Sequence, residues 1–280
     1  MPGAFGVERC GACGSGITTP PAASERLADF YPSGYGPYEL PANPLLRLVS
    51  RAIRAWQARS ALRAYPLGPA RELRPGRAVD VGCGRGDLAA TLLSHGWAVT
   101  GVEPSPAACA VARSRGVDAR EGTLRDVELE SEGYDLAVFQ HSLEHVPDAV
   151  ADLRTVAAAL RPGGIVSITV PNFGSWQSRR FRSRWFHLDL PRHRTHFTEE
   201  GLRRALGAAG LEPVRIETST SSIGLPASIQ YAAVGRCLFP EGLPLRVAAG
   251  LCALTWPLSR LADLVAGGGD QLHAVGRRPG

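Results

Sequence analysis

The sequence contains no lysine. All 31 basic residues are arginines, and with 26 acidic residues they give a formal net charge of +5. The arginines are scattered along the chain, so the positive charge does not form the concentrated patch that is typical of proteins that bind nucleic acid. We therefore expect no nucleic-acid partner.

The sequence also lacks a long hydrophobic run. No stretch reaches the roughly 18 uninterrupted apolar residues needed to span a bilayer, and the first residues do not follow the charged, apolar and small-residue succession of a secretory leader. The 280 residues, 44% of them hydrophobic, can bury a sizeable core, which excludes disordered and fibrous classes. We expect a cytoplasmic protein without a transmembrane segment.

Cysteines are few, and the six present do not form a disulfide framework. Cys10 and Cys13 form a CxxC pair in CGACG, but a structural zinc site needs four ligands and the sequence has no second CxxC. Residues 1–44 are rich in Gly, Pro, Ser and Tyr and have no helical or strand period. We expect an irregular N-terminal arm there.

A cap helix is predicted after this arm. From Leu45 to Tyr65 apolar residues recur at helical spacing, and Pro66 and Gly68 end the pattern. We expect residues 45–72 to form a cap helix and linker over the mouth of a domain at 73–280.

From Arg77 onward, short apolar runs alternate with helical stretches, as in a parallel sheet wrapped by helices. The fold class is α/β, a doubly wound sheet. Strands are expected at Arg77–Val81, Ala98–Val102, Val117–Arg120, Tyr134–Phe139, Ile165–Val170, Pro213–Thr218 and Leu272–Arg278. Helices are expected at Asp87–His95, from Ser105 to Gly116, at Pro147–Arg161 and from Thr198 to Ala209.

A glycine-rich loop, VDVGCGRGD at 79–87, follows the first of these strands. Glycine lets the backbone turn sharply and lets a ligand lie against it. A dinucleotide fingerprint counted from Gly82 needs a glycine at 87, where this chain has Asp87. The carboxylate of Asp80 would repel a pyrophosphate and attract an ammonium or sulfonium, which favours a cationic amino-acid ligand.

The second strand ends in GVEPS, and Glu103 lies 21 positions beyond Gly82. An acid at this spacing accepts hydrogen bonds from ribose hydroxyls. A solvated turn residue is the alternative interpretation of Glu103.

With these motifs the chain resembles the class I S-adenosylmethionine-dependent methyltransferases. The motifs that carry the resemblance are VDVGCGRGD, GVEPS, YDLAVFQHSLEHV at 134–146, and LRPGG followed by IVSITVPN. The resemblance covers roughly 77–278 and implies a mostly parallel seven-stranded sheet whose last strand lies between the fifth strand and Pro213–Thr218. The segment 175–206 is similar to the ubiquinone-type, natural-product and polysaccharide-cluster subgroup (methyltransferase type 23-like), whose N-terminal cysteine ribbon is vestigial here.

The resemblance also implies the cofactor contacts. Asp80 and the loop would hold the methionine part of S-adenosylmethionine, Glu103 the ribose, and Thr123 with Leu124 the adenine. Many relatives carry an acid where this chain has Thr123. The cofactor-binding set is Asp80, Gly82, Cys83, Gly84, Gly86, Glu103, Pro104, Thr123, Leu124 and Gln140.

His141 ends the fourth strand at the edge where such folds bind ligands, and its intrinsic pKa suits proton abstraction near neutrality. We expect it to be the catalytic base for a hydroxyl acceptor; the alternative is a residue that only positions the cofactor. His141, Glu144 and His145 could also ligate a divalent metal. We expect no metal, because these residues more often fix the loop before the next helix.

Two insertions are predicted on the acceptor side, at 172–197 and 221–269. The first is dense in arginine and aromatic residues, which suits an acceptor with a planar or anionic part; a solvated lid is the alternative. The second could be a pocket wall, a homodimer surface, or a patch that rests on a membrane. The expected acceptor contacts are Trp176, Arg184, Trp185, Arg192 and His193.

The sequence therefore predicts a methyltransferase that acts on oxygen of a small molecule or of a glycan or lipid-linked intermediate. The residues do not identify the acceptor. Two alternatives stay open: a nucleotide-dependent oxidoreductase, and a cofactor-binding subunit that assists another protein without turnover.

Overall fold

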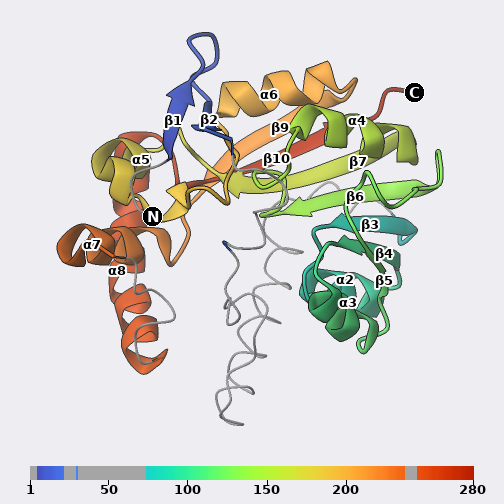
Figure 1. Cartoon of the computed structure of the whole chain (residues 1–280), viewed down its shortest axis with the longest axis horizontal. Helices are drawn as coiled ribbons and strands as arrows, with labels where there is room; N and C mark the ends of the chain where they lie inside the picture. Colours follow the sequence, from blue (N-terminus) through green and yellow to red (C-terminus); the bar gives the residue numbers. More distant parts are fainter. Residues whose placement is uncertain (1–4, 22–29, 31–73, 237–244) are drawn as a thin grey trace.

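The computed structural model describes residues 5–21, 30, 74–236 and 245–280 (Figure 1). The predicted cap helix and linker at 45–72 lie outside the described residues, as does most of the predicted N-terminal arm. The predicted domain at 73–280 is described almost throughout.

The centre of the molecule is a seven-stranded sheet in the order β5-β4-β3-β6-β7-β10-β9. The first five strands of this order are parallel, and β10 pairs antiparallel with both β7 and β9. The predicted doubly wound, mostly parallel sheet is confirmed, including the place of the last strand, β10, between β7 and β9. The strands are β3 Arg77–Val81, β4 Ala98–Glu103, β5 Asp118–Glu121, β6 Tyr134–Gln140, β7 Leu160–Pro171, β9 Glu212–Ser219 and β10 Gln271–Arg277.

Helices cover both faces of this sheet, and three of the four named below have a side-chain cap at the N-terminus. Ser105 accepts a hydrogen bond from the backbone of Ala108, and Asp148 and Thr198 cap their helices in the same way. Two separate apolar clusters result, one under α4 and α6 and the other under α2 and α3. The helices are α2 Asp87–Ser94, α3 Pro106–Arg113, α4 Ala149–Ala159 and α6 Glu199–Ala208.

The N-terminal arm contains a β-hairpin where the sequence analysis expected irregular chain. Its strands are β1 Gly6–Arg9 and β2 Gly16–Thr19, and β2 also pairs with β8 Thr195–His196. The expectation is wrong for this stretch because the strands have four residues each and their partner lies about 180 residues away. Neither a short strand nor a distant partner leaves a local period in the sequence.

Both predicted insertions are largely helical. The first contains α5 Trp176–Phe181, two short 3₁₀ turns and β8; the second contains α7 Gly224–Val234 and α8 Leu245–Ala266. Figure 1 shows α5, α7 and α8 grouped together, away from α2 and α3. We call the described residues 175–191, 221–236 and 245–268 the helical lobe. Among the helices that the structure describes, none has the length and apolar content needed to cross a membrane.

The hairpin should stabilise the acceptor-side insertion through Thr18. Its buried hydroxyl donates to the carbonyl oxygen of His193 and lies 3.0 Å from Nε2 of His196. We predict that Thr18→Val lowers the free energy of unfolding by about 1 to 3 kcal/mol, since a buried carbonyl loses its partner. Thr19→Val, at the exposed neighbouring position, is the matched control. Equal urea midpoints for the two variants would contradict the role of the hairpin.

Candidate active site

The glycine loop joins β3 to α2 at the carboxyl edge of the parallel strands. Gly82, Gly84 and Gly86 all have positive φ, +73°, +53° and +74°, which side chains rarely adopt. A Cβ on Gly82 would lie 2.5 Å from the Cβ of Ser142, and one on Gly86 would lie 3.0 Å from the Cβ of Ala112. A Cβ on Gly84 would meet nothing within 4 Å. Gly84 therefore borders open space in which a ligand can lie against the backbone.

Asp80, on β3 just before the loop, is a buried acid. The residue is 1% exposed, and its Oδ2 is buried without a hydrogen-bond partner. Burial, together with the negative charge of Glu103, raises the pKa of Asp80 to about 7. A cation bound beside Asp80 would offset the cost of ionising it.

Glu103, at the end of β4, holds the loop from the other side. Its Oε2 accepts a hydrogen bond from the backbone of Gly84 and its Oε1 one from Ser105, both at 2.9 Å. Burial raises the pKa of Glu103, whereas these two bonds act in the opposite direction. A carboxylate has about four acceptor positions, so this one can still accept from a ligand's hydroxyls.

His141 follows β6 on the same edge and has a left-handed backbone, with φ +53°. Its Nδ1 lies 3.5 Å from Oε1 of the buried Glu144, and its Nε2 lies 3.3 Å from the amide nitrogen of Gln271. Because an amide nitrogen only donates, Nε2 accepts and the proton resides on Nδ1, facing the carboxylate. The ring is 36% exposed, so the arrangement presents a basic nitrogen near solvent.

Glu144 also lies at the centre of a group that can hold a metal ion. Ligand atoms of Glu144, His145 and His193 lie within 4.8 Å of one another. His145 and His193 each donate from Nδ1 to a backbone carbonyl, at 3.1 and 2.9 Å, so Nε2 is the ring atom of each that would bind a metal. The metal alternative in the sequence analysis named His141 as the third residue, whereas this group contains His193 from the first insertion.

The five predicted acceptor residues do not share one environment. Trp176 donates from Nε1 to Asp263, and the exposed Arg184 donates to a carbonyl oxygen on α7 at 3.1 Å. Arg192 forms an ion pair with Asp189. Trp185 is 1% exposed and packs on Phe173, and His193 is buried as well. Trp185 therefore packs in the core, where the sequence analysis expected a contact with the acceptor.

Comparison with known proteins decides the family. Residues 50–216, more than half of the chain, match the family described as "Methyltransferase domain". The chain belongs to this methyltransferase family. Two curated relatives are named "Ubiquinone biosynthesis O-methyltransferase". One, from Methylobacterium sp. (strain 4-46), is 40% identical over 106 residues, 36% of this chain and 42% of the relative. The other, from Azorhizobium caulinodans, is 32% identical over 158 residues, 51% of this chain and 62% of the relative.

The methyltransferase spans about half the length of the curated relatives it matches. Among solved structures, an S-adenosylmethionine-dependent methyltransferase from Thermotoga maritima is similar to it in fold, with a TM-score of 0.52 and 21% sequence identity. That alignment covers 83% of this chain and 96% of the other. The class I fold predicted from the motifs is therefore confirmed.

The methyl donor of this family is S-adenosylmethionine, and the residues present fit it. The methionine part is a small cation, for which the structure offers the buried Asp80 carboxylate, with its Oδ2 unpartnered, and the open space at Gly84. Gln140 adds a buried amide oxygen without a hydrogen-bond partner. These three features lie at the ends of β3 and β6, which are paired in the sheet.

The remaining predicted cofactor residues differ in what they can offer. Cys83, within the loop, is buried, and burial raises the pKa of its thiol, whereas Pro104 is exposed. The hydroxyl and backbone amide of Thr123 both donate to Asp126, at 2.7 and 2.9 Å. Asp126 therefore places a carboxylate beside Thr123.

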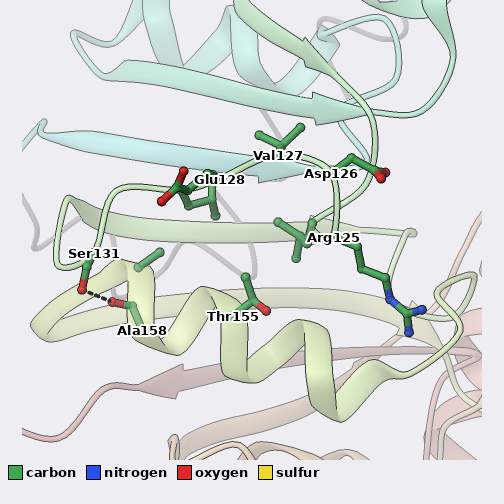
Figure 2. Close-up of a pocket in the computed structure, with 10 residues that line it drawn as sticks. Arg125, Asp126, Val127, Glu128, Ser131, Thr155 and Ala158 are labelled. Carbon is green, nitrogen blue, oxygen red and sulfur yellow. Dashed lines mark hydrogen bonds between the residues drawn. The ribbon is translucent and has the colours of Figure 1, made fainter.

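A hollow of about 480 Å³ lies between α4 and the loop at 124–131 (Figure 2). Its wall on the helix side includes Thr155 and Ala158, and the loop side includes Arg125 and Glu128. Leu124 is the one predicted cofactor residue among those that line it. The hollow is separate from the glycine loop and from His141, so we do not assign the acceptor to it.

Sequence reasoning missed the partners of the predicted site residues. Gln271, at the start of β10, contacts His141 from 130 positions away. Asp270 accepts from the Ser221 hydroxyl at 2.6 Å and lies 3.1 Å from Nε2 of His187, and so joins the two insertions. No local motif indicates these contacts, because each pairs residues that only the finished sheet brings together.

Asp80 should make the stability of the free protein depend on pH. Its pKa in the folded protein, about 7, lies above the unfolded value, so the native state binds more protons and stability falls as pH rises through this range. Asp80→Asn removes this titration, so the variant should be more stable than the wild type at high pH. We predict that this difference in free energy of unfolding is about 2 to 3 kcal/mol smaller at pH 5 than at pH 8. If urea denaturation gives the same difference in free energy of unfolding between variant and wild type at pH 5 and pH 8, the assignment is contradicted.

Proposed function

We propose that this protein transfers a methyl group from S-adenosylmethionine to a hydroxyl oxygen of a small molecule or of a glycan or lipid-linked intermediate. The observation that carries the proposal is the His141–Glu144 pair, placed on the same sheet edge as the cofactor loop. The names of the curated relatives, which are O-methyltransferases of ubiquinone biosynthesis, support an oxygen acceptor.

The cofactor supplies a methyl group on a positively charged sulfur. Asp80 would attract the cationic methionine part, and Glu103 would accept from the ribose hydroxyls while it keeps the Gly84 backbone in place. Since methyl transfer is an in-line displacement, the remaining contribution of the protein is to align the acceptor and exclude water.

His141 would remove the proton from the acceptor hydroxyl. Its Nε2 lone pair, which accepts from Gln271 in the structure, is the atom available to a hydroxyl. Glu144 is a positioning residue, because its carboxylate faces Nδ1 and favours the tautomer that carries its proton there. The strained backbone at His141 is consistent with a residue held in place for function.

Neither alternative function is supported. An oxidoreductase would place a pyrophosphate beside the buried Asp80, where its charge would be repelled. Asp87, where a dinucleotide-binding loop needs glycine, is paired with Arg115 at 2.6 Å. A cofactor-binding subunit without turnover would not need a carboxylate–imidazole pair on the cofactor edge.

The cofactor assignment is tested by calorimetry with S-adenosylhomocysteine and NAD. We expect the wild type to bind S-adenosylhomocysteine and not NAD, and Gly84→Val to bind neither, since its side chain fills the ligand's space. Gly163→Val is the matched control, because Gly163 also has a positive φ, +76°, and open space around it. Wild-type affinity in folded Gly84→Val would contradict the assignment.

The role of His141 is tested with labelled cofactor and a panel of hydroxylated acceptors. We predict that His141→Ala lowers kcat about 100-fold or more and leaves S-adenosylhomocysteine affinity nearly unchanged. The wild-type rate should rise with pH through one titration, and that limb should vanish in the variant.

Chelation separates the base from the metal alternative. Activity that persists in EDTA supports His141 as the base, whereas loss in EDTA and recovery with a divalent ion would assign the role to Glu144, His145 and His193. Should His141→Ala instead lose cofactor affinity in proportion to rate, with its pH limb intact, His141 only positions the cofactor.

A further inference from the structure

The exposed hydrophobic side chains of this protein are concentrated on two helices. Among the described residues, ten large hydrophobic side chains are exposed, and eight of them belong to α7 or α8. Isolated exposed apolar residues are normal on protein surfaces, whereas a contiguous group marks an interaction site. The eight are Ile229, Val234, Leu254, Trp256, Leu258, Leu261, Leu264 and Val265.

On α8 the exposed residues form a stripe. Leu254, Leu258, Leu261 and Val265 follow one another at intervals of four, three and four residues, which places them on one face of the helix. The opposite face is fixed by Asp263, which is buried and accepts hydrogen bonds from Trp176 and Thr220. Packing against the lobe therefore holds the apolar stripe toward solvent.

The exposed charges of the helical lobe are all positive. None of the lobe's described residues is an exposed Asp or Glu, since Asp189 is half-buried and paired with Arg192, and Asp263 is buried. Arg260, also on α8, has its guanidinium 5.5 Å from the ring centroid of Trp256. The exposed arginines are Arg179, Arg180, Arg182, Arg184, Arg236 and Arg260.

We propose that the helical lobe docks on an anionic lipid surface. The stripe on α8 would enter the boundary between headgroups and acyl chains, and the arginines would bind lipid phosphates. Arginine suits this position because its aliphatic stem packs on apolar surface while its guanidinium reaches the headgroups.

The charges disfavour a second copy of the chain as the occupant. In a symmetric dimer each surface meets its own copy, so the exposed arginines of the lobe would face each other with no described acid in the lobe to pair with them. An anionic membrane satisfies both the apolar stripe and the charge. The lobe begins after β7, at the carboxyl edge that carries His141, so docking would bring the membrane to the acceptor side of the sheet. This inference does not depend on methyl transfer.

The test is co-sedimentation of the full chain with vesicles of phosphatidylcholine alone or with about 30% phosphatidylglycerol. We expect binding to the anionic vesicles at least tenfold tighter than to the neutral ones, and weaker as salt is raised, because exposed charges are screened. Equal binding to both, binding insensitive to salt, or no binding would overturn the proposal. These wild-type measurements decide it even if a variant fails to fold.

Variants then locate the surface. Leu258→Asp combined with Leu261→Asp should lower vesicle affinity tenfold or more, whereas Ile17→Asp, at a residue 64% exposed against 63% for Leu258, should not. Arg236→Glu and Arg260→Glu should each weaken binding about fivefold or more. If the leucine variant keeps wild-type vesicle binding, or if it only converts a dimer to a monomer in light scattering, the lobe is not a membrane surface.

Discussion

The buried carboxylate of Asp80 is the constraint on which the site depends. It lies under the glycine loop with one oxygen unpartnered, close enough to Glu103 for the two charges to oppose each other. Such an arrangement costs stability in the free protein, and a bound cation offsets the cost. The parallel pairing of β3 with β4 and β6 is what brings Asp80, Glu103 and His141 to one edge.

The two insertions form the acceptor side on the same edge of the sheet. The first insertion follows β7, the second separates β9 from β10, and buried polar contacts join them. Asp270 links Ser221 to His187, and Asp263 links Thr220 to Trp176. Because these partners are buried, the helical lobe is held to the site by specific hydrogen bonds as well as by apolar packing. Its outer surface, in contrast, is apolar and positively charged.

Local signals in the sequence predicted much of the fold. The glycine loop, the helix that starts at Ser105, and the alternation of strands with helices each depend on neighbouring residues, and all appear in the structure. The order of the last two strands came from family resemblance and is also confirmed.

The rest depends on contacts between distant residues. The β1–β2 hairpin is stabilised by β8, and the Gln271–His141 contact exists only because β10 pairs with β7. Trp185 lies in an arginine-rich segment that suggests binding, yet its side chain is buried in the core. An aromatic ring in such a segment can serve either purpose. Periodicity carries no information about such choices.

The most direct test of the account is an NMR titration of the Asp80 side-chain carboxyl carbon, in the free protein and with S-adenosylmethionine bound. The account predicts a pKa of about 7 in the free protein, lowered by the cationic ligand. An ordinary carboxyl pKa of about 4 in the free protein, unchanged by the ligand, would contradict it.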